Sequence, residues 1–135
     1  MAIRGGCLCG AVSYELGAEL GGISHCYCSM CRKHHGAAFA TYGTAARSAL
    51  VITDPSGALR SFRSSAAAKR TFCSRCGSSL FFEPDDEPDH IEVALGTLNE
   101  EPGRWPEAHI FVRDKPAWVP ILDSLPQYPA SRRQS

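Results

Sequence analysis

The 135-residue chain lacks an apolar run long enough to span a bilayer, and its first residues contain no apolar segment of the kind found in secretory signals. It also lacks net charge, because 14 basic side chains balance 14 acidic ones. A general nucleic-acid or membrane-surface binder needs a cationic face, so neither kind of partner is expected. These absences favour the cytoplasm, where thiols stay reduced.

Helical signals are also scarce. The one helical turn that the sequence suggests follows Cys31, from Arg32 to His35, and ends at Gly36. Apolar or alternating segments instead predict strands at 12–16, 37–42, 59–63, 70–72, 79–82, 91–95 and 109–113. Many short strands separated by Gly, Pro and Ser predict a mainly β fold, a sandwich or an open barrel. We expect one domain over residues 1–128 and a disordered polar tail over 129–135.

The chain is rich in cysteine. Seven cysteines cannot all pair within one chain, and in a reducing compartment a cysteine-rich sequence indicates metal binding or catalysis. They form three groups: Cys7 with Cys9, Cys26 with Cys28 and Cys31, and Cys73 with Cys76. Such short spacings allow one tight turn to present two sulfurs to a tetrahedral zinc ion.

A glycine distinguishes two of these groups from the third. Gly10 follows Cys9 and Gly77 follows Cys76, and glycine accepts the positive φ that lets a loop fold back around a metal. Each pair is therefore interpreted as half of a structural site. Together they predict a closed four-cysteine zinc site that joins the start of the chain to its middle.

The middle group offers three thiolates, and cationic residues follow it in place of glycine. Three protein ligands leave a fourth position for water or substrate, the pattern of a catalytic zinc. Two alternatives stay open. One is a single four-cysteine site built from any two groups. The other is a second site closed by a histidine, for which His25, His34 and His35 are the candidates.

Several segments resemble the glutathione-dependent formaldehyde-activating family, which includes centromere protein V-like proteins. The matching segments are Gly6-Cys-Leu-Cys-Gly10, His25-Cys-Tyr-Cys-Ser-Met-Cys-Arg-Lys33, Phe72-Cys-Ser-Arg-Cys-Gly77, Ile91-Glu-Val-Ala-Leu-Gly-Thr-Leu98, His109-Ile-Phe-Val and Pro116-Ala-Trp118. The resemblance implies a β-tent fold of twisted antiparallel sheets with few short helices. It also implies a structural zinc on Cys7, Cys9, Cys73 and Cys76 and a catalytic zinc on Cys26, Cys28 and Cys31.

The same resemblance implies a carbon–sulfur lyase that joins formaldehyde to glutathione. On this hypothesis Arg32 and Lys33 bind a glutathione carboxylate, and His109 moves a proton because its pKa lies near neutrality. One fold hosts many functions, so two other classes compete. The first is a zinc-stapled binding module without catalysis. The second is another thiol-dependent enzyme, such as a methionine sulfoxide reductase. The oligomeric state is not defined by the sequence.

Overall fold

The computed structural model describes residues 2–132. Strands dominate it, as expected from the scarcity of helical patterns. The elements in chain order are β1 (Ile3–Gly6), β2 (Ser13–Leu16), β3 (Gly21–Cys26), α1 (Ser29–His35), β4 (Ala40–Ala46), η1 (Arg47–Ala49), β5 (Leu50–Thr53), β6 (Leu59–Ser65), β7 (Ala68–Cys73), β8 (Ser79–Pro84), β9 (His90–Ala94), η2 (Leu95–Thr97), β10 (Ala108–Ile110) and η3 (Val112–Asp114).

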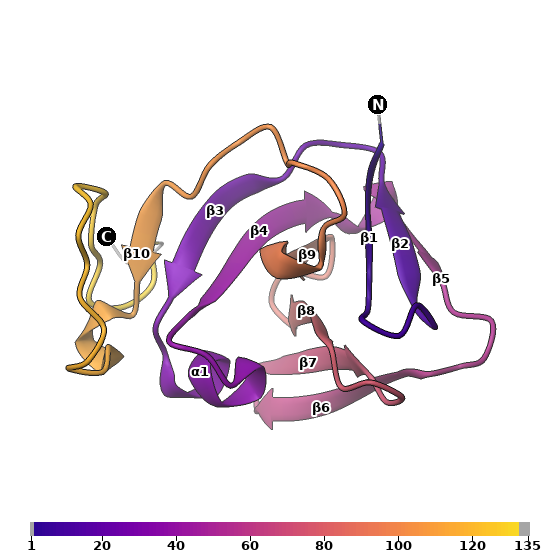
Figure 1. Ribbon diagram of the computed structural model, residues 1–135, viewed down its shortest axis with the longest axis horizontal. Helices are drawn as coiled ribbons and strands as arrows, with labels where there is room; N and C mark the ends of the chain where they lie inside the picture. Colours follow the sequence, from indigo (N-terminus) through magenta and orange to yellow (C-terminus); the bar gives the residue numbers. More distant parts are fainter. Residues whose placement is uncertain (1, 133–135) are drawn as a thin grey trace.

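The strands form two twisted sheets. A three-stranded sheet has the order β1-β2-β5, and a seven-stranded sheet has the order β10-β3-β4-β9-β8-β7-β6. Figure 1 shows the large sheet curling from β10 round to β6, with the small sheet packed at one side. The pairs are antiparallel except for β10 with β3, which is parallel. The mainly β, twisted fold is confirmed, and the expectation of purely antiparallel sheets is corrected at this one edge.

The main core lies between the two sheets. On β9, Ile91 and Val93 are buried in this core, in the same cluster as Leu16 and Leu20. Glu92 and Ala94 must then point to the opposite face of the large sheet, because successive side chains in a strand alternate. That opposite face carries a smaller cluster built on Cys26, Cys31, Ala40, Tyr42 and Ala94. The large sheet thus separates the main hydrophobic core from the smaller cluster that contains Cys26 and Cys31.

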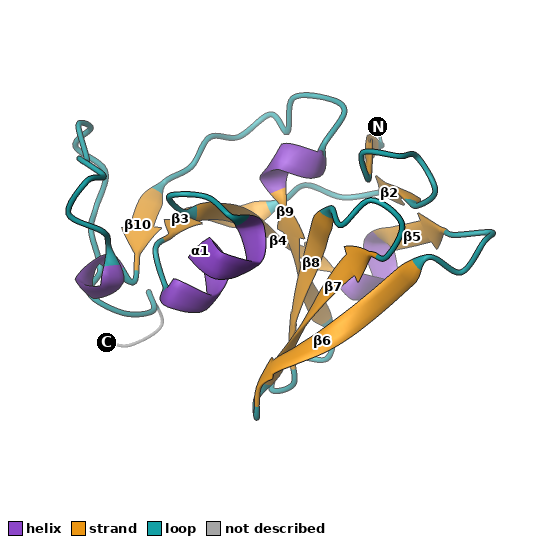
Figure 2. Ribbon diagram, turned by 60° about the horizontal axis from the view of Figure 1, so that its bottom comes forward, coloured by secondary structure: helices purple, strands orange, loops and turns teal. Residues whose placement is uncertain are grey.

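The only α-helix among residues 2–132 is α1, and it stands where the sequence predicts a helical turn. It ends at Gly36, whose φ of 60° and ψ of 41° are left-handed and whose N–H donates to the Arg32 carbonyl. Figures 1 and 2 show α1 between the end of β3 and the β6–β7 side of the large sheet. The helix therefore carries Cys31 toward strands that are distant in sequence.

The C-terminal segment differs from expectation. The strand predicted over 109–113 ends at Ile110, because Phe111 adopts a left-handed φ of 54° and η3 follows it. Phe111 N–H donates to the Ala130 carbonyl at 3.1 Å, and Arg132 Nη1 lies 2.8 Å from Glu107 Oε1. Residues 129–132 are therefore held against β10 and do not belong to a disordered tail. Residues 133–135 lie outside the described part of the chain.

Within residues 2–132, no helix has the length and apolar character that crossing a membrane requires.

Glycine is required at one point of the small sheet. Gly5 on β1 is the cross-strand partner of Tyr14 on β2, and the Tyr14 ring lies directly over it while its hydroxyl bonds Thr97 Oγ1 at 2.6 Å. A Cβ at Gly5 would stand 2.4 Å from Tyr14 Cζ and 2.6 Å from the Thr97 carbonyl oxygen. Gly21 on β3 is the matched contrast, because a Cβ there meets nothing within 4 Å.

We expect Gly5→Ala to lower the free energy of unfolding by about 1–3 kcal/mol through overpacking. Gly21→Ala should change it by less than about 1 kcal/mol, or raise it slightly, because alanine loses less backbone entropy on folding. Urea denaturation of both variants beside the parent protein measures the difference. Equal stabilities for the two variants would contradict the close approach at Gly5.

Candidate metal centres and the adjoining pocket

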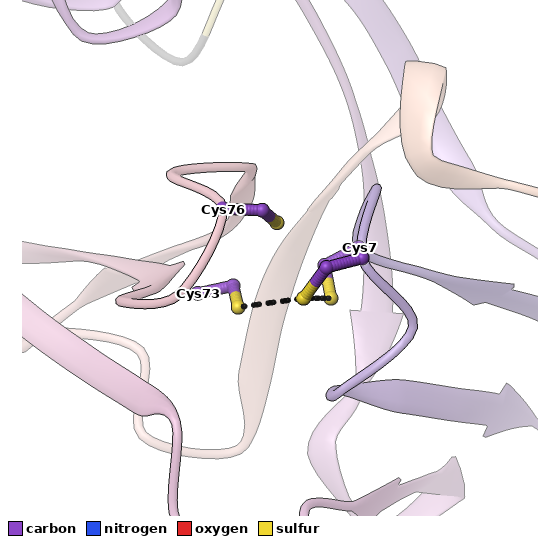
Figure 3. A group of neighbouring side chains, drawn as sticks. Cys7, Cys73 and Cys76 are labelled. Atoms are coloured by element: carbon purple, nitrogen blue, oxygen red, sulfur yellow. Dashed lines mark hydrogen bonds between the residues drawn. The ribbon is translucent and has the colours of Figure 1, made fainter.

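Four cysteines from two distant loops converge at one point. The β1–β2 loop supplies Cys7 and Cys9, and the β7–β8 connection supplies Cys73 and Cys76; each offers a sulfur that lies within 4.8 Å of the others. Figure 3 shows Cys7 facing Cys73 and Cys76 across the gap between these loops. The grouping is the one that the glycine pattern predicts.

The two loops differ in length but share a glycine of the same conformation after the second cysteine. Gly10 and Gly77 both have a φ of 81°, which favours glycine. Gly10 N–H donates to the Cys7 carbonyl at 3.2 Å, and Gly77 N–H donates to the Cys73 carbonyl at 2.7 Å. These bonds close each turn so that both sulfurs of a pair point the same way. The Ser78 hydroxyl, 3.2 Å from the Cys76 sulfur, lowers the pKa of Cys76 to about 5, which favours the thiolate that binds metal.

The sulfur spacing fits a tetrahedral metal. Zinc–sulfur bonds of about 2.3 Å place neighbouring sulfurs of a tetrahedron about 3.8 Å apart. The Cys7 and Cys9 sulfurs lie 3.7 Å apart, and those of Cys9 and Cys73 lie 3.8 Å apart. All four cysteines are free of disulfides. The donor set and its spacing therefore suit a closed structural zinc.

The other three cysteines form a second cluster. Cys26 ends β3, Cys28 precedes α1 and Cys31 lies in its first turn, and their sulfurs are also within 4.8 Å of one another. The Cys31 and Cys26 sulfurs lie 3.4 Å apart, and both residues are buried. The two clusters use all seven cysteines and share none, which supports the division into four and three.

The second cluster favours negative charge at Cys28. The Cys28 sulfur accepts the Cys31 N–H at 3.3 Å and so caps the start of α1. Hydrogen bonds from Cys26 and Cys31 lower the pKa of Cys28 to about 2, and the same bonds together with burial raise the pKa of Cys26. Of these two thiols, Cys28 therefore favours the thiolate and Cys26 the neutral form.

The candidate histidines do not complete this cluster. His25 points to the other face of β3, where its Nδ1 lies 2.8 Å from Thr41 Oγ1. His35 Nε2 lies 2.7 Å from the Tyr42 hydroxyl, and the His34 ring packs against His35 and Phe72. Among the described residues, no histidine nitrogen groups with the three sulfurs. The structure thus supports a site with three protein ligands.

A pocket of about 490 Å³ opens beside the three-cysteine cluster. Its size suits a small-molecule ligand. Cys26, Cys28 and Cys31 line it together with the aromatic rings of Tyr42 and Phe82, whereas no sulfur of the four-cysteine cluster does. One cluster is therefore part of a binding cavity and the other is not.

The sequence interpretation did not identify two arginines that line the pocket. Arg70 on β7 is only 2% exposed, lines the pocket and donates from Nη1 to the Cys31 sulfur at 3.4 Å. Arg132, from the C-terminal segment, also lines the pocket, and its Nη1 lies 3.1 Å from Ser24 Oγ. The predicted cations lie elsewhere: Arg32 Nε donates to the Tyr27 carbonyl, and Lys33 is exposed; neither lines the pocket. On β7 both Arg70 and its neighbour Thr71 are buried, so no alternation of polar and apolar residues in the sequence marks Arg70 as a pocket residue.

His109 belongs to a buried chain on the far face of β3. It pairs with His25 in the β10–β3 register, whereas its neighbour Ile110 pairs with Cys26 and lines the pocket. His109 Nδ1 lies 2.9 Å from the Tyr27 hydroxyl and its Nε2 lies 2.9 Å from Asp123 Oδ1. The His109 hydrogen bond lowers the pKa of Asp123. His109 therefore anchors Tyr27, the residue between Cys26 and Cys28. It does not line the pocket.

The fold and the two clusters define a class: a small, mainly β protein with one closed cysteine centre and one that faces a cavity. The chain belongs to the family described as "Glutathione-dependent formaldehyde-activating enzyme", whose model matches residues 2–114. A Halomonas elongata protein named "Putative glutathione-dependent formaldehyde-activating enzyme" is 26% identical over 128 residues, covering 90% of this chain and 82% of the relative. A Rhodobacter sphaeroides protein of known crystal structure superposes with a TM-score of 0.60 at 29% identity, covering 76% of this chain and 97% of that one. The resemblance expected from the motifs is confirmed.

The partly buried His35 generates a prediction on pH. Burial lowers the pKa of His35 to about 4, from an ordinary value of 6.5. Between these values the unfolded chain binds a proton that the folded one does not, so stability falls as the pH drops from about 6.5 toward 4. After allowance for solvent screening, we expect acidification from pH 7 to pH 5 to cost the parent protein about 1 kcal/mol more than His35→Gln.

Urea denaturation of both proteins at the two pH values measures this difference. Both carry the same cysteines, so any acid release of metal affects them alike and cancels. An equal loss in the two proteins would contradict a depressed His35 pKa.

Proposed function

We propose that the protein is a zinc-dependent carbon–sulfur lyase that joins formaldehyde, or a related small aldehyde, to glutathione or a similar thiol. The observation that carries this proposal is that the three-cysteine cluster lines the pocket while the four-cysteine cluster stands apart from it. The family to which the chain belongs points to the same pair of substrates. We also propose the cytoplasm as the compartment, because glutathione keeps thiols reduced there.

This proposal gives different tasks to two zinc ions. Cys7, Cys9, Cys73 and Cys76 would hold a structural ion, which joins the β1–β2 loop to the β7–β8 connection. Cys26, Cys28 and Cys31 would hold the second ion with a coordination position left for a ligand from the pocket. A zinc bound there would supply a Lewis acid that stabilises a substrate thiolate or polarises a carbonyl oxygen.

The protein's own part is to hold and orient the two reactants. The reaction forms one carbon–sulfur bond, and the thiol proton is transferred to the aldehyde oxygen to give an S-hydroxymethyl adduct. Tyr42 and Phe82 supply an apolar wall that limits water, and the cavity brings thiol and aldehyde together, which replaces an encounter in solution. Tyr27, fixed by His109, holds the loop that carries two of the ligands.

The first prediction of this proposal concerns metal content. Elemental analysis of the protein should find two zinc ions per chain. Cys28→Ser should lose one ion and stay folded, because its cluster lies at one face of the large sheet. Cys76→Ser should lose the other ion and, with it, several kcal/mol of stability, since structural zinc contributes directly to folding. One ion in the parent protein, or the reverse pattern in the variants, would overturn the assignment of roles.

The second prediction concerns activity. Exchange NMR of a glutathione and formaldehyde mixture should show faster adduct formation with the fully zinc-loaded protein than without it. Cys28→Ser is the matched control, because it removes one pocket sulfur by a single-atom exchange. An unaccelerated reaction at full metal loading would refute the lyase and favour the binding module.

A further inference from the structure

Arg70 is a cation where cations are rarely found. It lies in the middle of β7 at 2% exposure, and arginine is almost never fully buried without a partner. Its guanidinium packs over the Phe82 ring, 4.8 Å from the centroid, and Nε donates to Ser64 Oγ at 3.1 Å. These contacts from neighbouring strands hold the group in one orientation, with Nη1 directed at the Cys31 sulfur.

The pocket lining carries two carboxylates, Glu87 and Glu92, and two cations, Arg70 and Arg132, and of these Arg70 donates to a cysteine sulfur. The register places Arg70 opposite Phe82, and Phe82 opposite Glu92, so an aromatic ring separates the cation from that carboxylate. Glu92 in turn accepts the Thr44 hydroxyl at 2.9 Å on the next strand. Arg70, Phe82 and Glu92 thus form a row across three strands, and Arg70 is the charged residue of this row that contacts the sulfur cluster.

The two clusters differ in their need for a counter-charge. Cys9 of the four-cysteine cluster is exposed, so water screens the charge of that site. Cys26 and Cys31 are 5% and 4% exposed, and a buried excess charge is costly unless a charged group offsets it. Three thiolates around a divalent ion already carry one excess negative charge, and an incoming thiolate adds another.

We infer that Arg70 is the specificity-determining residue of the pocket, whose fixed positive charge favours ligands that bring an anionic atom to the three-cysteine centre. This inference rests on the proposed function, because it requires a metal at that centre. It selects substrates by charge at the reacting atom: a thiol that binds as its thiolate is preferred over a neutral nitrogen or oxygen ligand of similar size.

A spectroscopic titration tests the inference without any measurement of catalysis. Cobalt replaces zinc in thiolate sites and reports a new ligand by its visible absorption. The cobalt-loaded protein is titrated with 2-mercaptoethanol as the anionic probe and with imidazole as the neutral probe. The ratio of the two affinities is the quantity of interest, because a general loosening of the pocket would weaken both probes.

We expect Arg70→Met to lower the thiol-to-imidazole affinity ratio about 10- to 100-fold, the range typical for loss of a group that contacts a metal ligand. Arg70→Lys keeps the charge and should restore most of the ratio. Arg60→Met is the matched control, since Arg60 is an exposed arginine on the adjacent β6 and its loss makes the same change in net charge.

An unchanged ratio in Arg70→Met, with both probes bound by the parent protein, would overturn the inference and leave the proposed function standing. The same holds if Arg70→Lys fails to recover the ratio, because packing and not charge would then be responsible. A parent protein that takes up only one cobalt, at the four-cysteine cluster, would instead refute the metal centre on which the proposed function depends.

Discussion

The convergence of four cysteine sulfurs at tetrahedral spacing is the constraint that joins the two sheets, and as thiolates these sulfurs would repel one another unless a cation lay between them. The β1–β2 loop belongs to the small sheet and the β7–β8 connection to the large one, and Cys9 and Cys73 lie 64 residues apart along the chain. Their sulfurs nevertheless approach to 3.8 Å. A metal bound at this point would close a long loop, which is where a cross-link restricts the unfolded chain most in principle. The hydrophobic core between the sheets can then be small.

The two faces of the large sheet have opposite requirements for side-chain polarity. One face is a conventional apolar layer, on which Val93 and Phe81 pack beneath Tyr14. The other lines a cavity with guanidinium and carboxylate groups beside three sulfurs, and these charged groups would be costly to bury against such a layer. Because strand residues alternate, a single segment such as Ile91-Glu92-Val93-Ala94 supplies both faces at once. The strands β3, β4, β6, β7, β8, β9 and β10 therefore all contribute to the pocket lining, and α1, turns and the C-terminal segment supply the rest.

The sequence was most informative where local geometry decides the outcome. Cysteine spacing and a following glycine predicted both clusters correctly, because a metal-binding turn is set by a few consecutive residues. The α1 turn and most strands were predicted for the same reason. Three strands, β1, β3 and β5, were not predicted. The pairing of distant strands could not be deduced either, and the parallel β10–β3 edge was not expected. Arg32 and Lys33 were favoured because they are adjacent to Cys31 in sequence, whereas Arg70 reaches it from 39 residues away through the curl of the sheet.

The C-terminal segment has a consequence for how members of the family can diverge. All seven cysteines and Arg70 lie within the matched range of 2–114, whereas Arg132, which also lines the pocket, lies beyond it. The two arginines of the pocket are thus encoded in separate stretches of sequence. Mutations in the last stretch can change the pocket lining while leaving both cysteine clusters intact. Two relatives with identical cysteine motifs can therefore accept different molecules, and motif identity alone is a poor guide to what each one consumes.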